Sequence, residues 1–137
     1  MRRRRLHQIV FTLAGVYNIS WGLFAAADPQ WLFRFADMPP MVHPPIYQAM
    51  GMVVGVYGVL YLEVARRPEH GWLMAAVGWL GKVLGPIGML QLVLSGQWPP
   101  EVLVLNLTND FIWLPFFTVY LWDAWPMFRR SLTEGEA

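Results

Sequence analysis

The sequence predicts an all-α integral membrane protein, folded as an antiparallel up-down bundle of four transmembrane helices. Two observations lead to this prediction. Of the 137 residues, 56% are hydrophobic and only 14% are charged, which is too apolar for a water-soluble surface of ordinary size. The chain also contains four long apolar segments joined by short connections. These segments and connections use nearly the whole chain, so we expect a single membrane domain, 1–137.

The four apolar segments run over about 6–27, 46–65, 71–95 and 102–125. A hydrocarbon core roughly 30 Å thick needs about 20 apolar residues in a helix, and each segment meets that length. The last two turns contain Pro68, Pro99 and Pro100 and are short, so the helices that they join should be antiparallel neighbours.

The arginines set the expected orientation. They cluster at 2–5, 66–67 and 129–130, whereas the loops on the opposite side carry only Arg34. By the positive-inside rule, both termini should face the cytoplasm of a bacterial inner membrane. The expected partner is the lipid bilayer, and nucleic acid is excluded because topology and anionic lipid account for the arginines.

An alternative for the first segment is a cleaved signal peptide, because Ala25, Ala26 and Ala27 before Asp28 resemble a cleavage site. The apolar run is longer than a typical signal core, so we favour a retained span. The following loop, 28–45, should face the periplasm and contain a short interfacial helix over 30–36. Two proline pairs then break that helix.

The residue inventory excludes several classes of chemistry. The chain has no cysteine, which rules out disulfides, thiolate catalysis and cysteine-ligated metal. His7, His43 and His70 fall near segment ends or in loops, so they cannot sandwich a haem within the bilayer. We therefore expect no cofactor and no metal.

The strongest polar feature is Lys82 with Asp110. Lys82 lies about 17 Å into the third segment and Asp110 about 14 Å into the fourth from the other side, at 1.5 Å per residue. Both should therefore lie at one depth on adjacent helices, where a direct ion pair would bury both charges. Such a pair is either structural, fixing the register of the helices, or part of a substrate, proton or ion site.

The fourth segment predicts a polar-aromatic face, because Asn106, Asn109, Asp110 and Trp113 follow helical spacing. Pro115 cannot donate a backbone hydrogen bond, so a kink or local opening is expected beside this face. The asparagines fit both interhelical hydrogen bonding and a ligand role. The predicted buried polar or ligand-binding centre comprises Asn18, Tyr57, Lys82, Asn106, Asn109, Asp110 and Trp113.

Two glycine faces and one ion pair complete the interpretation. Glycines 51, 55 and 58 form a small-residue surface for packing against a neighbouring helix or a second copy. Glycines 81, 85 and 88 indicate close packing or, together with Pro86, a broken helix. Glu63 should pair with Arg66 or Arg67 at helical spacing.

Four runs of the sequence, LAGVYNISWG, GMVVGVYGVLY, VGWLGKVLGPIG and TNDFIWLPF, resemble a family of small uncharacterised bacterial membrane proteins with four spans. The similarity covers about residues 13–117. Some members are labelled alkyl hydroperoxide reductase, but the resemblance implies no thiol peroxidase here because that chemistry needs a cysteine. The resemblance implies that five residues belong to one common arrangement: Asn18, Lys82, Asn109, Asp110 and Trp113.

A weaker similarity is confined to the last segment, where Asn109, Trp113 and Pro115 resemble the pattern that ends the sterol isomerase and sigma-2 receptor group. The spacing between Asn and Trp differs by one residue, and that group's earlier acidic and histidine residues have no evident counterparts.

Three functions follow as hypotheses. The first is a non-enzymatic bundle that binds a small apolar or amphipathic ligand, or a partner protein, around the Lys-Asp-Asn centre. The second is a small-solute or proton-coupled transporter acting as a homo-oligomer. The third is an enzyme on a lipid substrate, which would need Lys82 or Asp110 in a lipid-accessible cavity.

Overall fold

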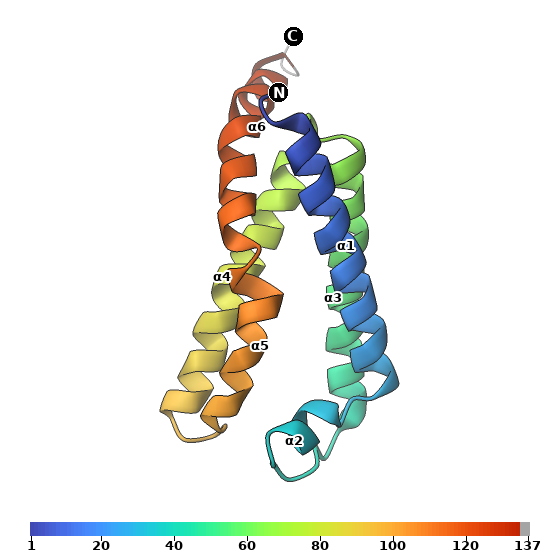
Figure 1. The fold of residues 1–137 in the computed structure, drawn as a ribbon, viewed down its shortest axis with the longest axis vertical. Coiled ribbons are helices and arrows are strands. Elements are labelled where there is room, and N and C mark those ends of the chain that lie inside the picture. Colours follow the sequence, from blue (N-terminus) through green and yellow to red (C-terminus); the bar gives the residue numbers. More distant parts are fainter. Residues whose placement is uncertain (135–137) are drawn as a thin grey trace.

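The computed structural model describes residues 1–134, and in that part of the chain it contains helices and connections but no strand (Figure 1). The elements are α1 (Arg4–Ala27), α2 (Trp31–Phe35), α3 (Pro44–Arg66), α4 (Trp72–Leu94), η1 (Pro100–Leu103), α5 (Val104–Asn106), η2 (Leu107–Phe111) and α6 (Leu114–Glu134). Four helical stretches are long and apolar enough to cross a membrane: α1, α3, α4 and the composite stretch Pro100–Thr133. The predicted four-helix membrane bundle is thereby confirmed. The main difference in bounds is that the fourth helix continues well past residue 125.

The four long helices alternate in direction and form two pairs, α1 with α3 and α4 with α5–α6 (Figure 1). The pairs approach each other at the end that holds both termini, which we call the terminal end. They diverge toward the opposite end, which we call the α2 end (Figure 1). The bundle therefore has the outline of an inverted V rather than of four parallel rods.

The pair α1 and α3 is held by glycines. A Cβ atom added at Gly22 would lie 2.5 Å from the carbonyl oxygen of Gly51, and one added at Gly58 would lie 2.6 Å from that of Gly15. Only hydrogen fits at these positions, so the two backbones lie in direct contact along a small-residue seam. The packing predicted for the glycine surface of the second span is confirmed, with α1 as the neighbour.

An aromatic core joins the two pairs near the terminal end. The ring of Phe11 on α1 lies 4.4 Å from that of Phe117 and 4.7 Å from that of Tyr120, both on α6. Tyr61 on α3 meets Phe117 edge-on at 5.0 Å between ring centroids. All four rings are at most 2% exposed.

Ion pairs surround this core. Asp123 on α6 accepts hydrogen bonds from Arg3 at 2.8 Å and from His7 at 2.9 Å, and Arg4 reaches Glu69 at 2.8 Å. His7, which the sequence places near a segment end, is in fact only 2% exposed. The predicted pairing of Glu63 is confirmed, because its carboxylate lies 2.6 Å from Arg66.

At the α2 end, a second core fills the space between the diverging pairs. The short helix expected over 30–36 is present as α2, and it buries Leu32 and Phe33 against Tyr47 of α3 and Val102 of η1. The ring of Phe33 also meets that of Trp98 at 5.8 Å. The two pairs are therefore connected at both ends, directly at the terminal end and through α2 at the other.

The fourth span is broken where Pro115 predicts an opening. The amide of Ile112 donates to the carbonyl of Leu107 at 3.2 Å, five residues back, and that of Trp113 donates to Asp110 at 3.0 Å, three residues back. Neither bond has the α-helical spacing of four, so the carbonyls of Thr108 and Asn109 lose their usual helical partners.

The third span matches neither of its two predicted alternatives in full. Helix α4 is continuous through Pro86, so the broken-helix alternative is wrong. Close packing of its glycine face is not found within the described chain either, because a Cβ atom at Gly81 or Gly88 would meet nothing within 4 Å. That face of α4 is open at Gly81 and Gly88, whereas a Cβ atom added at Gly85 would lie 3.7 Å from Oδ2 of Asp110.

Candidate ligand-binding cleft

The broken turn of the fourth span is the centre of the polar cluster. Lys82 on α4 donates from Nζ to the freed carbonyl of Asn109 at 2.6 Å. The indole of Trp113 donates from Nε1 to the freed carbonyl of Thr108 at 2.9 Å. Two side chains thus replace the two backbone partners that the irregular turn removes, which stabilises a segment that would otherwise leave polar groups unsatisfied in an apolar setting.

Lys82 is buried, with 5% of its surface exposed, against aromatic rings. Its Nζ lies 5.8 Å from the ring centroid of Tyr61 and 5.9 Å from that of Phe117, within the range of cation–π attraction. The lysine therefore has one short hydrogen bond and two aromatic faces as its immediate surroundings.

The direct ion pair predicted between Lys82 and Asp110 is wrong. Among the described residues, no nitrogen–oxygen contact of 4.0 Å or less joins them. The carboxylate of Asp110 instead accepts from Asn106 Nδ2 at 3.0 Å and faces Gly85, where an added Cβ would lie 3.7 Å from Oδ2. The two residues do share a level, as expected, but the irregular turn presents a backbone carbonyl to the ammonium group.

The remaining predicted residues separate. Asn18 is 5% exposed, and its amide donates to the carbonyl of Val54 at 3.5 Å, so it belongs to the seam between α1 and α3. Its predicted place beside Lys82 is not what the structure shows, because the glycines on its face hold that face of α1 against α3. The ring of Tyr57 lies 6.4 Å from that of Tyr61, and it is the Tyr61 ring that faces Nζ of Lys82.

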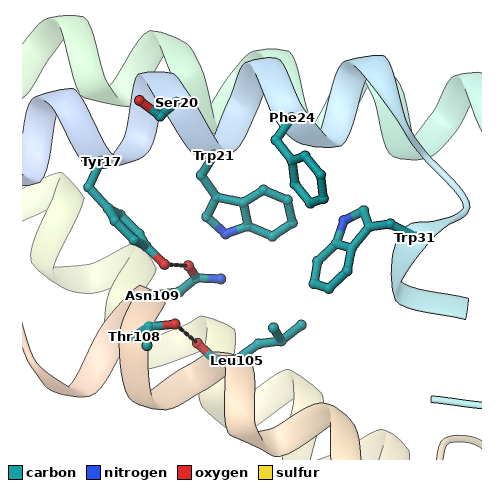
Figure 2. A pocket seen from close by; sticks show the side chains of 8 residues that line it. All are labelled: Tyr17, Ser20, Trp21, Phe24, Trp31, Leu105, Thr108 and Asn109. Atoms are coloured by element: carbon teal, nitrogen blue, oxygen red, sulfur yellow. Dashed lines mark hydrogen bonds between the residues drawn. The ribbon is translucent and has the colours of Figure 1, made fainter. Parts of the chain in front are cut away.

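A residue that the sequence did not single out as part of the site connects this cluster to the other helix pair. The hydroxyl of Tyr17 on α1 donates to Oδ1 of Asn109 at 2.5 Å, as Figure 2 shows. The ring of Tyr17 also lies 5.7 Å from that of Trp113. Asn109 consequently binds both pairs, Lys82 of α4 through its backbone and Tyr17 of α1 through its side chain.

Beyond the Tyr17–Asn109 bond lies an open cleft of about 330 Å³ between α1, α2 and α5–η2 (Figure 2). It is lined by Tyr17, Ser20, Trp21, Phe24, Trp31, Leu105, Thr108 and Asn109. The ring of Trp31 lies 5.4 Å from that of Trp21 and 5.3 Å from that of Phe24. The rings of Trp21 and Phe24 extend from α1 toward the ring of Trp31 on α2 (Figure 2).

The cleft has two chemically different ends. Figure 2 shows Tyr17, Thr108 and Asn109 toward one end, the rings of Phe24 and Trp31 toward the other, and the ring of Trp21 between them. None of its lining side chains carries a formal charge. A few polar groups in a mainly apolar and aromatic cavity of this size are typical of small-molecule sites. The arrangement can hold a flat apolar body against the rings and receive one hydrogen-bonding group beside Asn109.

Part of this cleft has a signal in the sequence. Tyr17, Trp21 and Phe24 follow the i, i+4, i+7 spacing of one helix face, so the aromatic wall of the first span could have been noticed. Trp31 has no such signal, because it lies on another helix after a turn. Of the predicted residues, the structure brings Lys82 together with four on the fourth span: Asn106, Asn109, Asp110 and Trp113.

No family model, curated protein or solved structure matches this chain.

Proposed function

We propose that this chain is a multi-pass protein of a bacterial inner membrane, with both termini in the cytoplasm, that binds a small neutral amphipathic ligand in the cleft between α1, α2 and α5–η2. The observation that carries the proposal is the pairing of an aromatic end with a hydrogen-bonding end in a cleft without charged side chains. A charged ligand group would find no counter-ion at this depth, where an unpaired charge is costly. Flat apolar rings gain most from the indole and phenyl faces.

The position of the cleft supports entry from the bilayer. Seven of its lining residues lie on α1 and on the α5–η2 stretch, both within helices suited to cross a membrane; the eighth is Trp31. A ligand that already partitions into lipid would reach such a cleft sideways, between the two arms of the inverted V.

The buried Lys-Asp-Asn centre has a supporting part in this proposal. Neither Lys82 nor Asp110 lines the cleft. Lys82 instead holds the carbonyl of Asn109, whose side chain forms the polar end of the cleft with Tyr17. The resemblance to the family of small four-span bacterial membrane proteins fits this view, since the runs LAGVYNISWG and TNDFIWLPF include five of the cleft residues.

Three pyrene compounds with the same ring and different charge test the ligand class. 1-Pyrenemethanol is neutral, 1-pyrenebutyrate is anionic and 1-pyrenemethylammonium is cationic. Fluorescence anisotropy of each compound is followed as purified protein in detergent is added. We expect saturable binding of the alcohol to the protein. The two ions should show only non-saturable partitioning into the protein–detergent complex.

Variants locate that binding. Trp21→Ala removes one ring of the cleft, whereas the matched control Trp122→Ala removes an indole that is 81% exposed and lies outside it. Tyr17→Phe removes only the hydroxyl at the polar end. The proposal requires that Trp21→Ala weakens saturable binding and that Trp122→Ala does not. Equal binding by both variants, or equal binding of all three pyrenes, contradicts it.

The orientation has its own test. Green fluorescent protein and alkaline phosphatase are fused in turn to the C-terminus and inserted in turn after Pro39. Termini in the cytoplasm predict fluorescence with the C-terminal fusion and phosphatase activity with the loop insertion. The reverse pattern would show the opposite topology.

Transport is a second candidate, and one observation favours it. The terminal end is closed by Arg3, His7 and Asp123, while the cleft lies on the other side of the Tyr17–Asn109 bond. A homo-oligomer, which this version needs, would have the open Gly81 and Gly88 face of α4 available. Because the chain lacks cysteine, Ser20→Cys supplies a single thiol, and transport predicts its labelling from both sides of the membrane. Labelling from one side alone contradicts transport.

The enzyme hypothesis has less support. It requires Lys82 or Asp110 in a cavity that a lipid can reach, and neither residue lines the cleft. The ionisable side chain that does line it, Tyr17, is engaged with Asn109.

A further inference from the structure

A second cavity, separate from the ligand cleft, lies between α1 and α6 at the terminal end. Its volume is about 190 Å³. Helix α1 contributes Leu6, His7 and Val10 to its walls, with Arg3 just before the helix. Helix α6 contributes Pro115, Phe116 and Val119. We call this cavity the α1–α6 groove.

The groove is apolar apart from Arg3 and His7. Leu6, Val10, Phe116 and Val119 form its walls, while Arg3 stands at its outer end, beyond the start of α1. The distance from Arg3 to Val10 along the helix is about 10 Å at 1.5 Å per residue. Leu6 and Phe116 are 41% and 44% exposed, so the groove is bordered by apolar side chains on the outer surface of the protein.

Arg3 is held in place by Asp123 but keeps hydrogen-bond donors that Asp123 does not engage. Its Nε and Nη2 bind the two carboxylate oxygens of Asp123 at 2.8 and 2.9 Å. Two of the five N–H groups of the guanidinium are thereby engaged, and its side chain remains 42% exposed. Its backbone has φ 57°, a left-handed conformation that a non-glycine residue keeps only where its surroundings hold it.

The charge around the outer end is positive. Arg2, Arg4 and Arg5 neighbour Arg3 in the sequence. Arg4 pairs with Glu69, whereas Arg2 and Arg5 form no ion pair with the acidic side chains that the structure describes. An occupant of the groove therefore meets hydrocarbon-like walls and a cationic end.

We propose that the α1–α6 groove binds one anionic phospholipid, with its phosphate at Arg3 and part of an acyl chain along Leu6, Val10, Phe116 and Val119. Charge complementarity selects the headgroup, and the apolar walls on two spanning helices select a lipid over a soluble anion. The lipid lies between the two helix pairs, beside their aromatic core. This inference goes beyond the proposed cleft, because the two cavities share no lining residue.

Native mass spectrometry of the purified full chain tests the proposal. The protein is titrated with dioleoyl phosphatidylglycerol or with dioleoyl phosphatidylcholine, which has the same chains and a zwitterionic headgroup. We expect one phosphatidylglycerol per chain to be retained preferentially. Arg3→Gln should weaken that binding about fivefold, the affinity equivalent of about 1 kcal/mol for one arginine near an anionic lipid.

A pair of leucine variants keeps the test decisive if Arg3→Gln folds poorly. Leu6→Ala shortens the groove wall, and Leu13→Ala makes the same change on the same helix at a residue that is 57% exposed and outside the groove. Reduced phosphatidylglycerol retention with Leu6→Ala but not with Leu13→Ala supports the assignment. Equal effects of the two leucine variants, or equal retention of the two lipids by the unaltered protein, overturn it.

Discussion

Asn109 links Lys82 of α4 with Tyr17 of α1 and so connects the two helix pairs between their closed ends. Its backbone carbonyl accepts from Lys82 and its side-chain oxygen accepts from Tyr17. The irregular turn leaves this carbonyl without the amide that bonds to it in a regular helix, and Lys82 supplies the donor instead. The irregular turn therefore gives Asn109 a hydrogen-bonding capacity that its sequence position alone does not.

Variants of Lys82 and Asp110 distinguish this arrangement from a direct ion pair. Lys82→Met leaves the Asn109 carbonyl without its donor, and we expect a loss of about 1–3 kcal/mol in stability. Asp110→Asn keeps an oxygen for Asn106 and should cost less. Thermal unfolding in detergent, followed by circular dichroism, gives both values.

The double variant completes that experiment. Removal of both members of a direct ion pair restores much of what either single change loses. Here we expect little recovery, because the lysine binds a backbone oxygen. A double variant nearly as stable as the unaltered protein would show that Lys82 and Asp110 do pair directly.

The hydroxyl of Tyr17 gives a second prediction at this scale. Tyr17→Phe removes the bond to Asn109 and should lower stability by about 0.5–1.5 kcal/mol. The matched control is Tyr57→Phe, since the hydroxyl of Tyr57 makes no hydrogen bond within the described residues. Thermal midpoints in one detergent are compared. A larger loss for Tyr57→Phe would contradict the bridging role of Tyr17.

Two proline-containing spans behave differently because of their neighbours. Helix α4 remains continuous through Pro86, whereas the fourth span is irregular over 107–113, just before Pro115. In the fourth span, Lys82 and Trp113 supply donors for the freed carbonyls. With these donors in place, the two carbonyls that the break frees are not left unsatisfied in an apolar setting.

The glycine seam makes a prediction about the first helix pair. Gly22→Ala would place a Cβ atom 2.5 Å from the carbonyl oxygen of Gly51, so the backbones must separate, and we expect a loss of about 1–3 kcal/mol. Gly81→Ala on α4 is the control, because its Cβ meets nothing within 4 Å. It should be neutral or stabilise by up to about 1 kcal/mol. Thermal midpoints decide, and equal losses would argue against the seam.

At the scale of the whole molecule, the two ends of the bundle are held by different interactions. Arginine–carboxylate pairs and a ring cluster join the helix pairs at the terminal end, and α2 fills the space at the other (Figure 1). The cleft lies between these two closures. Its shape therefore depends on the angle between the pairs, which both closures set.

The Arg4–Glu69 pair predicts how the terminal end responds to pH. The Arg4 guanidinium, which donates to the carboxylate, holds the pKa of Glu69 below its ordinary value of 4.5. A carboxyl group with a lowered pKa contributes its full stabilisation to the fold at pH values above its ordinary pKa. This contribution disappears as pH falls through the lowered pKa. Both side chains are partly exposed, so the contribution is below about 1 kcal/mol.

Comparison with Glu69→Gln measures this contribution. The difference in thermal midpoint between the unaltered protein and the variant should be constant near neutral pH, shrink as pH falls below 4.5 and vanish below the lowered pKa of Glu69. Glu101→Gln is the control, because Glu101 has no ion-pair partner among the described side chains. A Glu69→Gln difference that persists or grows in acid would contradict the pairing.

The sequence by itself determined the elements of this protein. The length of the apolar segments determined the four spans. Helical spacing determined the partner of Glu63, and Pro115 indicated the break. Each of these features depends on residues that are neighbours along the chain. Tertiary structure alone decided which groups meet inside. The ammonium group of Lys82 donates to the carbonyl of Asn109, and Asn18 faces α3. Trp31 joined Trp21 across a turn. Such contacts depend on helix rotation and on the angle between helix pairs, which packing sets and periodicity does not record.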